Sequence, residues 1–213
     1  MDKWGGSLDM GQTRESVEKE GAHEKCPIAP KQDPRVQRSR KLLVEAFRTL
    51  IGEDSYAEVS VAEIAQRAKV NRGTFYAHFT DKEDLAKTML REDLIEALSP
   101  HFSRKTPLNA EHLTRVGEVL FEFVGRLLLA CPTQVDAFLP VLTKTMQESI
   151  QTLVGDWIDF DRSALARFPS HNKEAITTVI TWSLYGGALR WSARIDRPPA
   201  RQAVQEIVTL LLR

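Results

Sequence analysis

The stretch at residues 60–79 constrains the fold of this chain more than any other, and it reads SVAEIAQRAKVNRGTFYAHF. Its first apolar residues recur at intervals of three and four, which predicts a short helix with one buried face. These residues are Val61, Ile64, Ala65 and Ala68. Ser60 and Glu63 have the spacing of a capping box, in which each residue satisfies an exposed backbone N–H of the other. The sequence therefore predicts a well-marked helix start at about residue 61.

A second short helix is predicted after a tight turn at residues 69–71, with Asn71 as its cap. Phe75 and Phe79 are four residues apart, so both would turn inward on one helix face. The other face carries hydrogen-bonding groups with little acid, which suits a groove of DNA better than a protein core. It holds Asn71, Arg72, Gly73, Thr74, Tyr76 and His78. The pattern indicates a helix-turn-helix whose second helix enters the major groove, and the alternative is an ordinary helical hairpin.

The flanking residues favour the helix-turn-helix. Residues 80–85, TDKEDL, predict a second capping box and a further helix. Lys82 would lie at the start of that helix, where a cation gains nothing from the macrodipole, and a phosphate partner would explain it. Between residues 34 and 51 the cations outnumber a single acid, Glu45, and beside a helix-turn-helix they indicate a phosphate-facing patch. They are Arg35, Arg38, Arg40, Lys41 and Arg48.

These residues resemble the DNA-binding domain of TetR/AcrR-type transcriptional repressors over roughly residues 37–97, because the turn, the aromatic pair and the lysine all have the family spacing. The resemblance implies a ligand-responsive repressor that binds a palindromic operator in double-stranded DNA as a homodimer. It places DNA contacts at Ser60, Val61, Asn71, Arg72, Gly73, Thr74, Tyr76, His78 and Lys82. Residues 182–191, WSLYGGALRW, are similar to the branch of this family that includes regulators of dihydroxyacetone kinase genes.

Composition bounds the remaining possibilities. The 213 residues are 42% hydrophobic and 27% charged, as in soluble globular proteins, and the formal net charge is zero. No apolar run reaches the roughly 18 residues of a membrane span, and no signal peptide is visible at the N-terminus. Cys26 and Cys131 are far apart and indicate no disulfide framework, so a cytoplasmic protein is expected. His23 and Cys26 lack the further ligands of a zinc site, and neither a metal nor a cofactor is expected.

The rest of the chain predicts helices only, and hence an all-α fold. A disordered extension at residues 1–33 is predicted to precede the DNA-binding domain at 34–99 and a helical bundle at 100–213. Within the first domain, helices are predicted at 34–51, ending near Gly52, and at 81–99. In the bundle we expect helices at about 109–130, 133–153, 162–168, 171–195 and 200–212, with a kink or late start at Pro140 and a polar connection at 155–161.

The predicted bundle is large enough for two roles, dimerisation and effector binding. The last two long helices are the dimer candidates, unless their apolar face packs internally; the residues concerned are Leu184, Gly187, Ala188, Trp191 and Leu211. Several large side chains are of the kind that line an apolar ligand pocket, and equally of the kind that fill a core. They are Phe121, Phe123, Phe138, Met146, Trp157, Trp182, Tyr185 and Arg190.

Two other classes of protein compete with a regulator. An enzyme is not expected, because the chain has no nucleophile elbow, phosphate loop, zinc pair at helical spacing or dinucleotide-binding turn. A protein-interaction adaptor or co-activator that uses the helix-turn-helix as a scaffold, without ligand sensing, is the alternative. Such an adaptor would lack salt-sensitive DNA binding.

Overall fold

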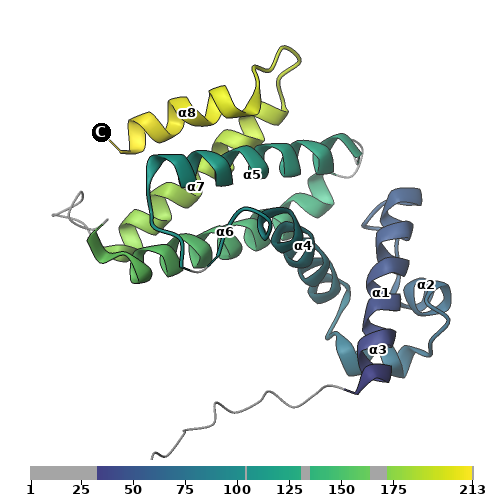
Figure 1. Ribbon diagram of the computed structural model, residues 1–213. Coiled ribbons are helices and arrows are strands. Elements are labelled where there is room, and N and C mark those ends of the chain that lie inside the picture. Colours follow the sequence, from purple (N-terminus) through teal and green to yellow (C-terminus); the bar gives the residue numbers. More distant parts are fainter. Residues whose placement is uncertain (1–32, 104, 131–134, 164–171, 213) are drawn as a thin grey trace, which may run out of the picture. The chain divides into compact units, whose positions relative to one another are not determined.

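The computed structural model describes residues 33–103, 105–130, 135–163 and 172–212, and within these ranges the chain is helical with no strand (Figure 1). Its α-helices are α1 (Pro34–Glu53), α2 (Val61–Arg67), α3 (Arg72–His78), α4 (Lys82–Leu98), α5 (Ala110–Ala130), α6 (Val135–Phe160), α7 (Lys173–Ser192) and α8 (Ala200–Leu211). The predicted all-α fold is confirmed. The disordered extension predicted at residues 1–33 lies outside the described residues except for Asp33.

The first three helices pack around a small core to which each contributes. Phe47 of α1, Ile64 of α2 and Phe75 of α3 are fully buried there. The turn between α2 and α3 closes through backbone bonds from Lys69 N to Gln66 O and from Val70 N to Ala65 O, both of 3.0 Å. This is the Schellman arrangement, and it places Lys69 in the left-handed region with φ 56°. The predicted turn at residues 69–71 is therefore a defined helix stop, which fixes the direction of α3.

Helix α4 packs against α1 on one side and against α5 and α6 of the C-terminal helices on the other. Leu85, Met89, Leu90 and Leu94 are its large buried side chains. The N-cap is Asp81, whose side chain accepts from Asp84 N at 2.8 Å. The carboxylate of Asp84 reaches back to the backbone N–H of Thr80 at 3.1 Å, one residue earlier than a strict capping box requires.

Helices α5 to α8 form the C-terminal bundle, in which α5 contacts α7 and α8, and α6 contacts α7 (Figure 1). Two glycines let helices approach closely: a Cβ on Gly117 would lie 2.4 Å from Val204 Cγ1, and one on Gly187 would lie 2.5 Å from Ile207 Cδ1. Leu184 and Ala188 are fully buried in the same layer. The prediction that Leu184, Gly187 and Ala188 pack against a second copy is therefore wrong, because this face packs on α5 and α8 of its own chain.

Helix boundaries differ from the prediction at three places. Helix α6 runs through Gly155 to Phe160, where a connection was expected, because Val154, Trp157 and Ile158 are buried in the core. Helix α7 begins at Lys173, capped by Asn172, and ends at Ser192. The short helix expected at 162–168 falls largely outside the described residues, and the helix start expected at residue 133 falls outside them entirely. Among the helices that are described, none is long and apolar enough to cross a membrane.

Candidate nucleic-acid interface

Helix α3 has one buried and one open face. The side chain of its N-cap, Asn71, accepts from Thr74 N at 2.7 Å and from Thr74 Oγ1 at 3.1 Å. Phe75 and Phe79 point inward with ring centroids 5.8 Å apart, which confirms the predicted aromatic pair. Arg72, Gly73 and Tyr76 are exposed, and the Tyr76 side chain is 54% accessible. The open face thus offers a guanidinium and a phenol to a partner outside the domain.

Arg72 and Gly73 open this helix. In the described part of the chain the Arg72 guanidinium makes no hydrogen bond or ion pair, so its donors are available for a bidentate contact. A Cβ on Gly73 would lie 3.1 Å from Asn71 Oδ1, the atom that caps α3. Glycine at this position therefore protects the cap that orients Arg72.

His78 ties the end of α3 to α1. Its Nε2 lies 2.7 Å from Ser39 Oγ, and Ser39 Oγ also lies 3.0 Å from the Val36 carbonyl, to which it donates. Burial, and then the positive charge of Arg40, hold the pKa of His78 below its ordinary value. A neutral imidazole that donates Nε2–H to Ser39 satisfies this network. His78 thus has a protein partner, Ser39, that sequence reasoning missed because nothing in the spacing pairs two residues 39 positions apart.

Lys82 holds the loop that leads into α2. Its Nζ donates to the carbonyls of Tyr56 at 2.6 Å, Val59 at 2.8 Å and Ala57 at 3.3 Å, and it lies 4.6 Å from the centre of the Tyr56 ring. Burial lowers the pKa of Lys82, and the carboxylate of Glu63 opposes this shift. The lysine therefore has three acceptors within the protein, and its place at a helix start does not require a phosphate.

The start of α2 lies next to this lysine. The predicted capping box is confirmed: Ser60 N donates to Glu63 Oε2 at 2.8 Å, and Glu63 N donates to Ser60 Oγ at 3.3 Å. Because Ser60 Oγ also donates to Glu63 at 2.7 Å, its one O–H donor is already used. Any phosphate at this end of α2 would therefore meet backbone N–H groups, such as that of Val61, more readily than the Ser60 hydroxyl.

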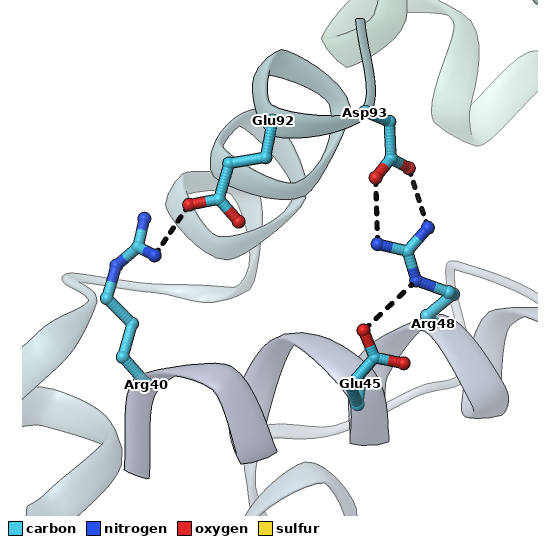
Figure 2. Close-up of polar contacts among 5 residues, drawn as sticks. All are labelled: Arg40, Glu45, Arg48, Glu92 and Asp93. Carbon is cyan, nitrogen blue, oxygen red and sulfur yellow. Dashed lines mark hydrogen bonds and ion pairs between the residues drawn. The ribbon is translucent and has the colours of Figure 1, made fainter. Parts of the chain in front are cut away.

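Two cations of the predicted phosphate-facing patch serve a different purpose (Figure 2). Arg40 contacts Glu92 of α4 at 2.6 Å, and Arg48 makes two bonds of 2.8 Å to Asp93. Glu45 lies 3.7 Å from Arg48 Nε and completes this group. Both arginines therefore join α1 to α4, and their assignment to DNA stays a prediction. The other cations of the patch, Arg35, Arg38 and Lys41, are exposed.

Most of the residues predicted to line an effector pocket lie in the core. Phe121, Phe123, Phe138, Met146, Trp157 and Tyr185 are buried, whereas Trp182 is 55% accessible and Arg190 is exposed. The Tyr185 hydroxyl lies 2.8 Å from Thr143 Oγ1, and Trp157 Nε1 donates to Ser103 O at 3.1 Å. Their role in ligand binding stays a prediction. None of them lines the cleft of about 590 Å³ between α4 and α6.

No group of three potential metal ligands occurs among the described residues, and His23 and Cys26 lie outside them.

Comparison with known proteins agrees with this geometry. Residues 43–89 match the family described as bacterial regulatory proteins, tetR family. The uncharacterized HTH-type transcriptional regulator YxbF of Bacillus subtilis (strain 168) is 34% identical over 67 residues, which are 31% of this chain and only 18% of that protein's length. The matched region contains α2 and α3, and the matches are to DNA-binding regulators rather than to enzymes.

Solved structures extend the likeness of fold to most of the chain. The fatty acid degradation regulator FadR from Bacillus halodurans has a TM-score of 0.55 at 17% identity, over 85% of this chain and 96% of that one. FadR from Bacillus subtilis in complex with stearoyl-CoA gives 0.54 at 16% identity, over 81% and 97%. A TetR-family regulator from Rhodococcus sp. gives 0.55 at 19% identity, over 83% and 100%. At these identities the similarity concerns the fold alone.

Proposed function

We propose, from the match of residues 43–89 to the tetR family of bacterial regulatory proteins, that this chain is a ligand-responsive repressor that binds a palindromic operator as a dimer. The observation that carries the proposal is the open face of α3. Arg72 and Tyr76 are exposed there, while Phe75 and Phe79 anchor the opposite face. Recognition helices of this kind contact base edges with their N-terminal residues.

Within this proposal the contacts divide into two kinds. Arg72 is long and cationic and reaches guanine N7 and O6, while Thr74 contacts a thymine methyl or a phosphate, and Gly73 allows close approach. Phosphate contacts are proposed for Tyr76, His78 and Lys82, and for the region of Ser60, Val61 and Asn71. Base contacts carry specificity, and phosphate contacts carry affinity for any sequence.

Selection of bound DNA from a random pool by the purified protein, followed by binding to matched and mismatched operators, tests this division. Arg72→Ala is expected to weaken the best operator by about 1–3 kcal/mol and to relax preference at one base pair. Arg126→Ala is the matched control, because Arg126 is an exposed arginine on α5. Equal losses in both variants, or no enrichment of any sequence from the pool, would refute specific recognition through α3.

Dimerisation is proposed because one helix-turn-helix reads few base pairs, and a two-fold dimer on a palindrome doubles the contacts. The outward face of α7 is the better candidate surface, since Val179 and Trp182 are 54% and 55% accessible and nothing lies within 4 Å of a Cβ on Gly186. Light scattering should give twice 24.1 kDa at micromolar concentration. Trp182→Asp should yield monomers, while Leu129→Asp, at an exposed apolar position on α5, should not. A wild-type monomer that binds a palindrome tightly would contradict the dimer.

Release from DNA by an effector is proposed to act through α4. This helix contacts α1 through the Arg40–Glu92 and Arg48–Asp93 pairs, and it also packs on α5 and α6 (Figure 2). A ligand shifts the equilibrium only if it binds one conformation better, and couplings of about 1–3 kcal/mol are typical. Effector and operator must then weaken each other's binding by the same factor. An effector that binds free protein and the DNA complex equally well would rule the mechanism out.

A further inference from the structure

A cleft of about 590 Å³ lies between α4, α6 and the segment that follows α4. This volume is within the range of about 300–1,000 Å³ that small-molecule sites occupy in proteins. Its apolar wall is formed by Leu94, Ile95 and Leu98 of α4, by Phe102, and by Leu153 of α6. Ile95 is 57% accessible although it is a large aliphatic residue, so this wall includes apolar surface that the protein itself leaves open. The cleft is therefore suited to a mainly apolar molecule.

The charged residues of the lining are already engaged within the protein. Arg91 of α4 and Glu148 of α6 form an ion pair of 3.2 Å that spans the cleft from one helix to the other. Asp156, the third charged residue of the lining, also interacts within the chain. A charged ligand would thus have to compete with an existing ion pair, while it loses its own hydration. An uncharged ligand meets neither obstacle.

One hydroxyl group in the lining has no partner. Ser149 Oγ is buried and forms no hydrogen bond among the described residues. The neighbouring hydroxyls are satisfied by backbone carbonyls: Thr152 Oγ1 donates to Glu148 O at 2.8 Å, and Ser99 Oγ donates to Glu96 O at 3.2 Å. Leaving a buried hydroxyl unpaired is unfavourable, and an acceptor on a ligand would relieve this. Ser149 is therefore the position where a ligand gains a specific polar contact.

We propose that this cleft is the effector site of the protein, and that the effector is an uncharged, largely apolar molecule with one hydrogen-bonding group that reaches Ser149. Calling the ligand an effector rests on the proposed function, but ligand binding in the cleft can be tested without DNA. The proposed ligand site is thus the cleft, and not the buried aromatic residues that the sequence suggested as pocket lining. It also assigns ligand contacts to Leu98, Arg91 and Leu94 of α4. Arg91 and Leu94 directly flank Glu92 and Asp93, the two residues of α4 that bind α1.

Binding of Nile red, an uncharged dye with one carbonyl acceptor, tests the site by fluorescence on the full chain. Ile95→Ser should weaken dye binding by about tenfold, because it removes apolar contact area from the wall. Leu129→Ser is the matched control, since Leu129 is similarly exposed at 61% but lies on α5 outside the cleft, and the dye should bind it like wild type. Ser149→Ala should weaken binding by about three- to tenfold, as the loss of a neutral hydrogen bond does. Thr152→Ala, which deletes a satisfied hydroxyl in the same lining, should not.

Displacement of the dye tests the charge of the ligand. Decan-1-ol should displace Nile red at lower concentration than decanoate or decylammonium, which share its chain but carry opposite charges. Equal dye affinity in Ile95→Ser, Ser149→Ala and the two controls would overturn the site, and better displacement by either ion would overturn the ligand class. Operator binding of the same proteins without dye is measured separately. A wild type that binds the dye as expected but no DNA refutes the proposed function and leaves the cleft assignment supported.

Discussion

The contact between Arg48 and Asp93 should stabilise the fold more than any other ion pair on α1. Its two parallel N–H···O bonds of 2.8 Å are bidentate, and the Asp93 side chain is only 17% accessible (Figure 2). Hydrogen bonds to charged groups contribute roughly 1.5–3 kcal/mol when desolvated. Since 43% of the Arg48 side chain remains accessible, solvent screening brings the expected value down toward that of exposed pairs. We expect a coupling free energy of about 1–2 kcal/mol between the two residues.

A double-mutant cycle measures this coupling directly. The unfolding free energies of Arg48→Ala, Asp93→Ala and the double variant are measured in urea. The coupling free energy is the change in the double variant minus the sum of the changes in the two single variants. The matched control is the pair Arg67–Glu53, which also begins on α1 and has a bidentate geometry of 3.1 and 2.6 Å. Both partners there are exposed, at 42% and 51%, so solvent screening should make its coupling smaller than that of Arg48 and Asp93.

Two outcomes would refute this reasoning about Arg48. A coupling of zero would mean that the bidentate geometry contributes nothing once screened. A coupling equal to that of Arg67 and Glu53 would mean that the partial burial of Asp93 has no energetic effect. The slope of the unfolding free energy with urea must stay unchanged in all variants, because a changed slope signals a change in the unfolded state or a loss of two-state behaviour.

Three further predictions follow from the contacts described above. Gly117→Ala should destabilise the bundle by roughly 1–3 kcal/mol relative to Gly52→Ala, because the new Cβ meets Val204 at 2.4 Å whereas Gly52 has open space; equal stabilities would contradict the packing. Because the pKa of His78 is lowered in the folded protein, the unfolded chain takes up a proton on this residue first, near pH 6.5. The unfolding free energy should therefore fall as the pH drops below about 6.5. His78→Gln should remove that part of the decline. Lys82→Met should lower stability through the loop it holds, and it should reduce the salt slope of DNA binding by about 0.9 only if the ammonium also contacts a phosphate.

The helix-turn-helix was predictable because its determinants are local. The Ser60–Glu63 box and the Asn71 cap each join residues three positions apart, and the structure contains both. Phe75 and Phe79 follow from the helical period in the same way. Signals of this kind depend on a few neighbouring side chains and on the orphan N–H groups of a helix start, so no tertiary information is needed.

The contacts that sequence reasoning missed are those whose partners are distant in sequence. The acceptors of Lys82 are backbone carbonyls 23 to 26 residues earlier, and backbone atoms leave no trace in a residue pattern. Arg40 is paired with a carboxylate 52 residues away, so a count of nearby charges made it appear available for phosphate. Gly155 suggested a helix end, but burial of Val154 and Trp157 on either side outweighs its low helix propensity.

Apolar periodicity has a related weakness, since it shows that a face is buried but not what covers it. The stripe with Leu184 and Ala188 was compatible with a second copy or with the protein's own helices, and the structure shows the latter. Trp182, on the same helix, is instead more than half accessible. The boundary predicted at residue 99, between the DNA-binding domain and the helical bundle, also stays a prediction. Residues Pro34–Arg213 form one compact unit, so the contacts do not mark a boundary there.

The free energies of the contacts that α4 makes decide whether the proposed switch is physically reasonable. Glu92 and Asp93 bind α1, while Arg91 and Leu94, their immediate neighbours, line the cleft against α6. A ligand that changes the spacing of α4 and α6 must therefore change the setting of the pairs with Arg40 and Arg48 as well. Partly exposed pairs of this kind contribute about 0.2–1 kcal/mol, or somewhat more when bidentate, and two of them together match the roughly 1–3 kcal/mol of a typical allosteric coupling. Loss of packing of the buried side chains Leu90 and Leu94 would cost about 2–5 kcal/mol each. In the proposed switch the ion pairs would therefore give way first, and α4 would move as an intact helix.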